Sequence, residues 1–428
     1  MAKNTDIKLR NSTIYSVYVR NHTKEGDFKG VTEDLDRIAD LGVDIIWLMP
    51  IHPIGQVNKK GKLGCPYSIQ DYRKVNPEYG TLEDFKELIS ETHKRGMKLI
   101  IDVVYNHTSH ESELLKSHPE YFYRKEDGQP GNKVGGWSDI IDLDYDNKEL
   151  WDYQIETLKY WVLLGVDGFR CDVAHLVPIE FWTRARREVA SVKKNAIWLA
   201  ESADSYFLKE LRQRKIMAHS DSEVFQAFDI AYDYDTYKYF AEYLRGERGL
   251  SYVLEAKRNQ DFIYPENYVK LRFLENHDNP RITYYLKEET DLKNWTAFMF
   301  FEKGAALIYA GQEAKDDNTP DLFNSDPVNW NKDIKFYEYI KKLIQIKKAD
   351  IFAYGQYEIL QQKKIGVIEA RYEYKGRQLI GIFNVERKIG SYKLNIKDGT
   401  YNNLIDGRVI QVSEGKIELQ LKPIILEA

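Results

Sequence analysis

Cysteine and long apolar runs are scarce in this sequence. Only Cys65 and Cys171 are present, which is too few for a disulfide framework. No window approaches the ~20 apolar residues of a membrane-spanning helix. The first residues, MAKNTDIKLRNSTIY, include no apolar stretch of the kind found in secretory signals. We therefore expect a cytosolic (cytoplasmic) protein with no membrane partner.

An excess of basic charge is also lacking. The chain has 62 lysine and arginine residues against 67 aspartate and glutamate residues, and its formal net charge is −5. A nucleic-acid-binding protein would normally present a basic stripe, so we expect no nucleic-acid partner. Hydrophobic residues make up 43% of the 428 residues, which suits one large folded domain with a smaller one beside it. None of these values specifies the oligomeric state.

The first half of the chain repeats one pattern, in which an amphipathic helix ends at a glycine and an apolar strand follows. The glycines are Gly42, Gly96 and Gly165, and the strands after them are predicted at 43–49, 97–103 and 166–171. Glycine suits these helix ends because it enters the left-handed conformation without a steric penalty. Strands that alternate with helices indicate a parallel sheet.

Five further apolar segments bring the number of predicted strands to eight. They lie at 14–19, 196–200, 224–228, 269–274 and 305–309. Eight strand–helix units over about 340 residues predict an α/β protein with a (β/α)8 TIM barrel. The alternative is a doubly wound open sheet, which would need a glycine-rich phosphate loop after an early strand. The sequence contains no such loop.

Two segments interrupt this pattern. A polar, glycine-rich stretch follows the third strand and predicts a short excursion at 107–141. From residue 350 the sequence changes to short alternating runs that are separated by turn pairs such as Lys375-Gly376 and Glu414-Gly415, which predicts an antiparallel β-sandwich domain at 350–428. The catalytic barrel would then comprise residues 1–106 and 142–349.

Acidic residues occupy the carboxyl ends of several predicted strands. Asp172 ends the fourth strand, Glu201 ends the fifth, and Asp278 follows the seventh. A single aspartate at such a position is commonly a helix N-cap, but side chains that perform chemistry in a barrel also come from these ends. Three carboxylates at matching depth therefore favour an active site.

Two of these carboxylates suit the cleavage of a glycosidic bond with retention of configuration. One ionised carboxylate attacks the anomeric carbon and one protonated carboxyl protonates the leaving oxygen, at a separation of roughly 5 Å. Asp172 and Glu201 end successive strands, which is the right scale. Arg170 precedes Asp172 by two residues, so both side chains share a face of the strand. We expect Arg170 to hold Asp172 ionised and oriented.

Four short motifs resemble those of the α-amylase family of glycoside hydrolases (family 13). They are IDVVYNH at 101–107, GFRCDVAH at 168–175, LAES at 199–202 and FLENHD at 273–278. Their order and their places at strand ends match the family, and further similar segments extend over nearly all of the predicted barrel. The resemblance implies the barrel, a domain B after its third strand and a C-terminal β-sandwich.

The resemblance also implies a role for each matching residue. Asp172 would be the nucleophile, Glu201 the general acid/base and Asp278 the stabiliser of the transition state. The sugar at the cleavage point would contact four further side chains, namely Tyr67, His107, Arg170 and His277. For the two histidines and the tyrosine, the alternative is a structural hydrogen bond or loop packing.

A cofactor is not required by this chemistry. Many family members bind Ca²⁺ between the barrel and domain B, partly through the asparagine that corresponds to Asn106. Ca²⁺ prefers six to eight oxygen ligands, and one asparagine does not assign a site. Asp27 is retained from a second calcium loop found in some members, but the run of alternating acids around it is missing. The metal ligands therefore stay unassigned.

The expected function is hydrolysis of α-1,4-glucosidic bonds in maltodextrins, starch or glycogen, with an α-glucan as the partner. The family alternatives are an α-glucanotransferase or a glucosyl isomerase, because both share the covalent intermediate. Outside the family, one alternative is a Mg²⁺-dependent barrel enzyme that abstracts a proton beside a carboxylate. Another is a binding protein without activity. The sequence does not separate α-1,4 from α-1,6 preference, nor does it indicate product length.

Overall fold

The computed structural model describes residues 2–330 and 333–428, which form two compact units. The first unit comprises Met1–Thr5, Ile14–Tyr232 and Pro320–Val328. The second comprises Asp6–Thr13, Asp233–Thr319 and Asn329–Ala428. Within the described ranges, no helix combines the length and the apolar character that crossing a bilayer requires.

Eight parallel strands form a closed barrel, in which each strand pairs with its neighbours in chain order. The strands are β1 (Thr13–Val17), β2 (Ile45–Leu48), β3 (Lys98–Val103), β6 (Gly168–Cys171), β7 (Ile197–Ala200), β8 (Ile230–Tyr232), β9 (Val269–Arg272) and β10 (Ala305–Tyr309). Apart from Lys98, their residues are buried. The predicted (β/α)8 barrel is confirmed, and seven of the eight predicted strands lie where the apolar runs placed them.

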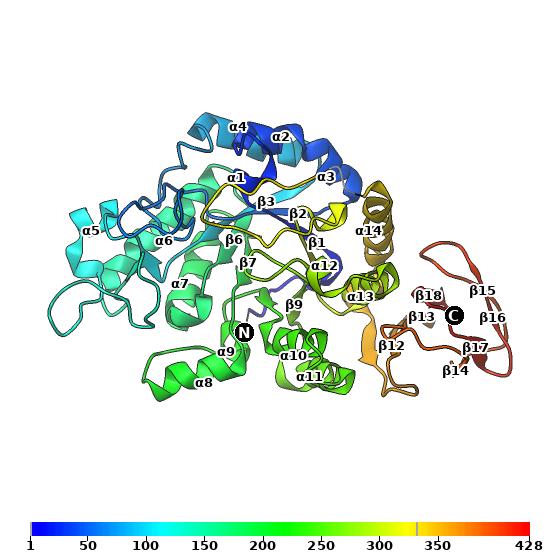
Figure 1. Cartoon of the computed structure of the whole chain (residues 1–428). Helices are drawn as coiled ribbons and strands as arrows, with labels where there is room; N and C mark the ends of the chain where they lie inside the picture. Colours follow the sequence, from blue (N-terminus) through cyan, green and yellow to red (C-terminus); the bar gives the residue numbers. More distant parts are fainter. Residues whose placement is uncertain (1, 331–332) are drawn as a thin grey trace. The chain divides into compact units, whose positions relative to one another are not determined.

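Helices connect the strands. In the first unit they are α1 (Val19–His22), α2 (Phe28–Glu33), α3 (Leu35–Leu41), α4 (Leu82–Lys94), α6 (Lys148–Leu163), α7 (Ile179–Val189), α8 (Ser205–Gln213) and α9 (Asp221–Val224). In the second unit they are α10 (Tyr234–Leu244), α11 (Leu250–Ile263), α12 (Ile282–Tyr285), α13 (Glu289–Phe301), α14 (Ile334–Lys347) and α15 (Ile351–Tyr354). Figure 1 shows α2, α3 and α4 on the outer side of β2 and β3. Apolar helix faces thus cover the strands, as the alternating sequence pattern predicts.

Local signals in the sequence define several helix ends. Gly42 adopts φ 98° after α3, in the left-handed region that a side chain would disfavour. At the start of α4, the side chain of Thr81 accepts a hydrogen bond from the backbone N–H of Asp84 at 3.2 Å, and the Asp84 carboxylate accepts one from the N–H of Thr81 at 2.8 Å. This capping box satisfies two backbone donors at once. Asp27 caps α2 by accepting a hydrogen bond from the N–H of Gly30 at 2.8 Å.

The strand predicted at 224–228 is wrong. Residues Asp221–Val224 form α9, which begins with a capping box between Ser220 and Glu223, and the sixth barrel strand is Ile230–Tyr232 instead. Val224 and Phe228 are buried, because a turn of helix packed on the barrel shields apolar side chains as well as a strand does. The apolar run therefore indicated that these residues are buried, but not that they form a strand.

The excursion after β3 begins and ends in a small antiparallel ribbon. Its strands are β4 (His107–Thr108) and β5 (Ile141–Asp142), with α5 (Glu113–Ser117) and a turn of 3-10 helix (Pro119–Tyr121) between them. His107 pairs directly with Asp142. The ribbon thus places His107 and the end of the excursion side by side, next to the carboxyl end of β3.

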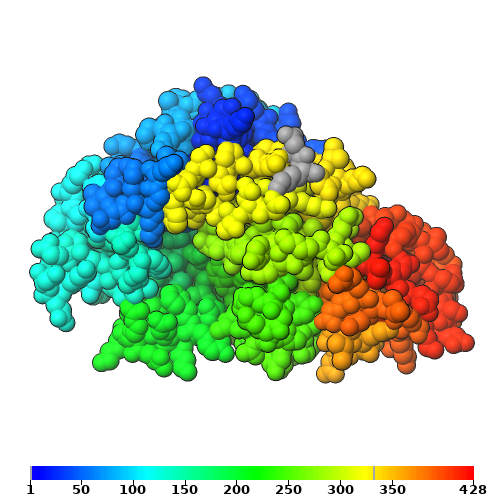
Figure 2. Space-filling model, in the orientation of Figure 1, coloured from blue at the N-terminus to red at the C-terminus, as the bar shows by residue number. Residues whose placement is uncertain are grey.

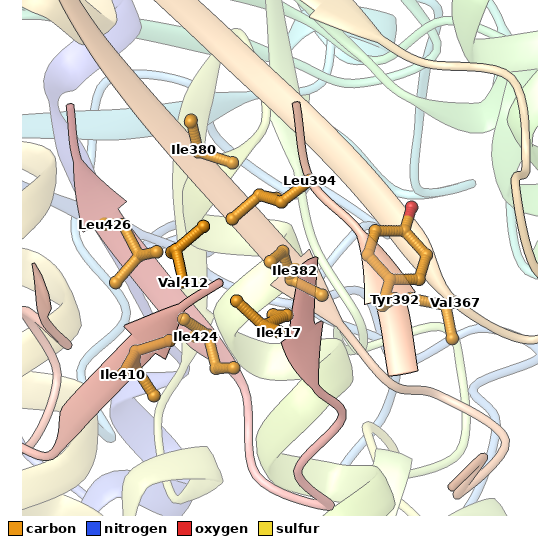
Figure 3. Packing of buried hydrophobic residues seen from close by; sticks show 10 residues of the cluster. All are labelled: Val367, Ile380, Ile382, Tyr392, Leu394, Ile410, Val412, Ile417, Ile424 and Leu426. Atoms are coloured by element: carbon orange, nitrogen blue, oxygen red, sulfur yellow. The ribbon is translucent and has the colours of Figure 1, made fainter. Parts of the chain in front are cut away.

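The C-terminal part of the second unit is an antiparallel β domain, as predicted. Its main sheet contains β11 (Gln356–Ile359), β12 (Ile368–Tyr374), β13 (Arg377–Phe383) and β18 (Ile424–Glu427). Two ribbons pair β14 (Ser391–Lys393) with β17 (Lys416–Glu418) and β15 (Gly399–Asn402) with β16 (Val409–Val412). Figure 3 shows side chains from the sheet and from the ribbons meeting in one buried cluster, which includes Ile382, Tyr392 and Val412. Lys375 and Gly376 join β12 to β13 with φ values of 51° and 76°, the geometry of a tight hairpin turn.

Candidate active site

A single buried guanidinium connects three carboxylates in the first unit. Arg170, on β6, places Nη1 at 2.8 Å from Asp172 Oδ1 and at 3.0 and 3.1 Å from the two carboxylate oxygens of Asp102. Its other terminal nitrogen, Nη2, lies 3.1 Å from Glu201 Oε1. Arg170 and Asp172 therefore share a face of the strand, as predicted from their spacing, and Glu201 lies beside them.

The register of neighbouring strands produces this convergence. Cys171 pairs with Ala200, so the next residue on each strand is Asp172 or Glu201. The N–H of Glu201 donates to Cys171 O at 3.0 Å, which extends the ladder by one bond. The strands come this close partly because Gly168 has no side chain: a Cβ there would lie 2.2 Å from the backbone oxygen of Ile197. The two predicted catalytic carboxylates are thus placed by backbone pairing.

Burial dominates the electrostatics of Asp172. The pKa of the Asp172 carboxyl is raised to about 6, because removal from water and the charge of Asp102 together outweigh the attraction of Arg170. Hydrogen bonds from Arg170 and from Glu201 lower the same pKa. Arg170 thus orients the carboxylate and favours its ionised form, while burial has the larger effect on its pKa.

Glu201 is held by the backbone as well as by Arg170. Its Oε2 accepts a hydrogen bond from the N–H of Val173 at 2.8 Å. Val173 adopts φ 36° and ψ 44°, a left-handed conformation that is unfavourable for a β-branched residue. Such strain is concentrated at functional sites, where the surrounding structure compensates for it. Here the strained residue is the one whose N–H orients the Glu201 carboxylate.

The structure brings Tyr67 to the same cluster. Its hydroxyl donates to Asp102 Oδ2 at 3.2 Å, and the guanidinium carbon of Arg170 lies 5.6 Å from the centre of its ring. His107 is buried on β4, with its ring centre 5.9 Å from that of Trp137. Burial lowers the pKa of His107, and this outweighs the opposite effects of Asp142 and Asp139. His107 is thus neutral near pH 7, and its ring can both donate and accept a hydrogen bond.

Three residues around Arg170 were not predicted. Asp102 accepts two hydrogen bonds from Arg170, and the rings of Trp47 and Tyr232 lie 5.1 and 5.3 Å from the guanidinium carbon. The hydroxyl of Tyr232 also accepts a hydrogen bond from Arg170 Nε at 3.3 Å. Asp102 could have been found, because it is the one charged residue inside the apolar run of β3 after Lys98. The two aromatic residues could not have been identified from the sequence in this way, since apolar strands contain many such rings.

Asp278 and His277 belong to the second unit, where they follow β9. His277 is buried, and its Nε2 lies 3.1 Å from Asp278 Oδ2. The N–H of Asp278 donates to Asn276 Oδ1 at 3.0 Å, so the turn that carries the carboxylate is fixed by a side chain. The Asp278 side chain itself is 44% exposed and accessible to a ligand.

The residues around Asn106 do not fit a calcium ion. The Asn106 amide donates towards Asp142 Oδ1 at 3.4 Å, and the nearby Asp139 carboxylate is paired with Lys60 Nζ at 2.9 Å. An ammonium group therefore already neutralises the carboxylate of Asp139, whose oxygens would otherwise suit a Ca²⁺ ion. In the part of the chain that the structure describes, no three His, Cys, Asp or Glu side chains are arranged to hold a metal ion.

Two protein-family models match this chain. Residues 10–131 and 135–351 match the family model described as "Alpha amylase, catalytic domain". Residues 358–426 match the "Bacterial Alpha amylase C-terminal domain". Together these matches extend over the barrel, the excursion and the C-terminal sheets.

Several solved structures and curated proteins are similar to the chain. An α-amylase from Lactobacillus plantarum is 44% identical, with a TM-score of 0.95 over 99% of this chain and 100% of that one. A noncanonic maltogenic α-amylase from Thermotoga neapolitana is 33% identical, with a TM-score of 0.87 over 98% of this chain and 99% of that one. An intracellular maltogenic amylase of Bacillus subtilis is 26% identical over 344 residues, which is 76% of this chain and 55% of that protein.

Proposed function

The chain belongs to the α-amylase family of glycoside hydrolases, and on this premise we propose that it hydrolyses α-1,4-glucosidic bonds in maltodextrins, starch or glycogen with retention of configuration. The observation that carries the proposal is the contact of one guanidinium, that of Arg170, with both Asp172 and Glu201. A shared cation holds the two carboxylates close together at neighbouring strand ends, and a double displacement needs two carboxyl groups roughly 5 Å apart.

In the proposed first step, the ionised Asp172 attacks the anomeric carbon while Glu201 donates its proton to the glycosidic oxygen. The bond between the anomeric carbon and the leaving oxygen breaks, and a covalent glycosyl ester with Asp172 forms. Asp278 stabilises the positive charge that develops on the sugar ring. The interactions that matter are those that strengthen in the transition state.

In the second step, a water molecule replaces the leaving sugar. Glu201, now ionised, removes a proton from the water while the water oxygen attacks the anomeric carbon. The ester bond breaks, and Asp172 leaves as a carboxylate. Two inversions at one carbon give net retention. Arg170 contacts both carboxylates, so Glu201 can change from acid to base without a large movement of either side chain.

Tyr67, His107 and His277 are proposed to bind the sugar at the cleavage point. Tyr67 supports this because its ring lies over the Arg170 guanidinium while its hydroxyl is anchored on Asp102, so the ring is held as a rigid stacking surface. The two histidines are buried at their strand ends, where they can form directional hydrogen bonds to sugar hydroxyls. We also propose a cytoplasmic location, which the intracellular maltogenic amylase among the relatives supports.

The test is product analysis on substrates that differ only in linkage. Purified protein is incubated with maltoheptaose, isomaltoheptaose and cellohexaose in EDTA, with the Asp172→Asn variant as control, and products are separated by chromatography. We expect shorter maltooligosaccharides from maltoheptaose alone. Cleavage of isomaltoheptaose in preference would move the activity to α-1,6 bonds. Products longer than seven glucose units would identify a transferase, and inactivity that Mg²⁺ reverses would identify the metal-dependent alternative.

A further inference from the structure

One ion pair with a buried carboxylate lies at the edge of the candidate site and is not used in the proposed reaction. Lys60, in the segment that follows β2, places Nζ at 2.9 Å from Asp139 Oδ1 in the excursion. The Asp139 side chain is 2% exposed, whereas Lys60 is partly accessible. A carboxylate withdrawn from water to this degree requires a compensating positive charge, since an unpaired buried ion is strongly unfavourable.

This pair lies in the region where the family resemblance implies a calcium ion. Asp139 and the buried Asp142 both act on His107 electrostatically, and Lys60 acts on it in the opposite direction. The side chain of Asn106 points to Asp142. Two carboxylates and an amide thus lie around His107. The ammonium group of Lys60 pairs with Asp139, whereas Asp142 accepts a hydrogen bond from the backbone N–H of Lys133 at 2.6 Å.

Lys60 also contacts a third segment. Its Nζ lies 5.9 Å from the centre of the Phe323 ring, in the segment 320–328 that folds onto the first unit. Two hydrogen bonds hold this segment beside Lys60, from Leu63 N to Phe323 O at 2.9 Å and from Lys62 N to Asn324 Oδ1 at 3.0 Å. Figure 2 shows the yellow surface of 320–328 against the blue surface of the segment after β2. One ammonium group therefore joins three loops.

A short chain of contacts leads from this junction to the site. The backbone oxygen of Asp139 accepts a hydrogen bond from Ser68 Oγ at 2.8 Å. The preceding residue, Tyr67, donates its hydroxyl to Asp102, which in turn accepts from Arg170. A displacement of Asp139 would therefore move Ser68 and, with it, the adjacent Tyr67, whose ring is proposed to stack on the sugar.

We propose that the Lys60 ammonium replaces the calcium ion that the family resemblance implies in its structural role, so that the fold does not depend on Ca²⁺. Lys60 is then also a positioning residue for Tyr67. The claim about stability is independent of the proposed function, whereas the claim about substrate binding rests on it. Lys59 is the matched control, because it is the adjacent lysine and its Nζ contacts the exposed Gln56 Oε1 at 2.9 Å.

The first experiment measures thermal unfolding of the full chain in EDTA and in millimolar CaCl2. Wild type should melt at the same temperature in both. Lys60→Met should lower Tm by about 5 °C, whereas Lys59→Met should lower it by less than about 1 °C. Lys60→Arg, which keeps the charge, should recover most of the loss. In an Asp139→Asn background, Lys60→Met should have little further effect, because the buried charge is gone.

The second experiment separates binding from chemistry with maltoheptaose. Lys60→Met should raise KM by about fivefold and change kcat by less than about twofold, because Asp172 and Glu201 are untouched. A Tm of wild type that falls in EDTA, or equal Tm values for Lys60→Met and Lys59→Met, would overturn the proposal. An unchanged KM beside a lowered Tm would remove the positioning role. Because the Tm measurements need no activity, failure of this proposal can be distinguished from failure of the proposed function.

Discussion

Arg170 Nη1 donates a 2.8 Å hydrogen bond to Asp172 Oδ1, and both side chains are buried at the carboxyl end of β6. This contact fixes the direction in which the carboxylate points. It does not lower the pKa of Asp172 below its usual range, because burial acts more strongly in the opposite direction. The nucleophile proposed here is therefore well oriented but charged only above mildly acidic pH.

The pH dependence of activity should report this carboxyl. With the pKa of Asp172 at about 6, the fraction of free enzyme that holds an ionised nucleophile falls below that pH. We expect kcat/KM for maltoheptaose to drop about tenfold per pH unit on the acidic side, with its inflection near pH 6. A flat profile down to pH 4.5 would contradict the assignment.

The same pKa has a consequence for folding. The folded pKa, about 6, lies above the ordinary value of 3.8, so the stability that Asp172 contributes is fully present below pH 3.8 and is lost as pH rises through 6. The difference corresponds to about 3 kcal/mol. Relative to wild type, Asp172→Asn should therefore gain free energy of unfolding between pH 4 and pH 7. Parallel pH profiles for the two proteins in urea titrations would show that Asp172 keeps its ordinary pKa.

Asp102 should control both Arg170 and the acidic limb of the pH profile. Asp102→Asn removes a charge that raises the pKa of Asp172, so the inflection of kcat/KM should move to lower pH, while activity at pH 7 falls because Arg170 is held less firmly. Asp167→Asn is the control, since that carboxylate pairs with Lys193 and His93 instead. It should alter stability without moving the inflection, and a shift in both variants would refute the specific coupling.

Removal of the proposed catalytic carboxylates should abolish activity without unfolding the protein. Asp172→Asn and Glu201→Gln should each lower kcat by about 10³-fold or more, and Asp278→Asn by about 10²-fold or more. Circular dichroism spectra should stay near wild type at pH 7. Retention of more than a tenth of wild-type activity by any one variant would remove that residue from the mechanism.

The junction between the segment after β2 and the segment 320–328 should be sensitive to a single methyl group. Gly61 adopts φ 63°, and a Cβ there would lie 2.7 Å from the backbone oxygen of Phe323. Gly128 adopts φ 79°, but no heavy atom of the described residues lies within 4 Å of its Cβ position. Both alanine variants are strained by φ, so Gly61→Ala should lose about 1 kcal/mol or more beyond Gly128→Ala in free energy of unfolding. Equal losses would show that the junction is loose.

The barrel could be predicted from the sequence because its signals are local. Each glycine that ends a helix, such as Gly42 with φ 98°, is required by the backbone at that point, and each strand after it is an uninterrupted apolar run. The strand ends that carry Asp172 and Glu201 followed from the same count. Residues 224–228 failed because a buried helical turn and a buried strand have the same apolar composition, and only the capping box at Ser220 distinguishes them.

Properties that depend on contacts between distant segments could not be predicted. The pKa of Asp172 reflects how completely the surrounding loops exclude water, which no spacing reveals. The pairing of Lys60 with Asp139 joins residues that are far apart in the chain and lie in polar loops without periodicity. Asp102 was open to prediction, since an acid inside an apolar strand needs a partner, but the identity of that partner required the register of β3 against β6.

The most direct test of the central claim follows the anomeric configuration of the first product. Maltoheptaose is incubated with the protein, and ¹H NMR spectra are recorded before mutarotation mixes the anomers. If Asp172 forms a covalent intermediate that Glu201 helps to hydrolyse, the first signals of new reducing ends belong to the α-anomer. Initial appearance of the β-anomer would mean a single displacement by water and would contradict the assignment of Asp172 as the nucleophile.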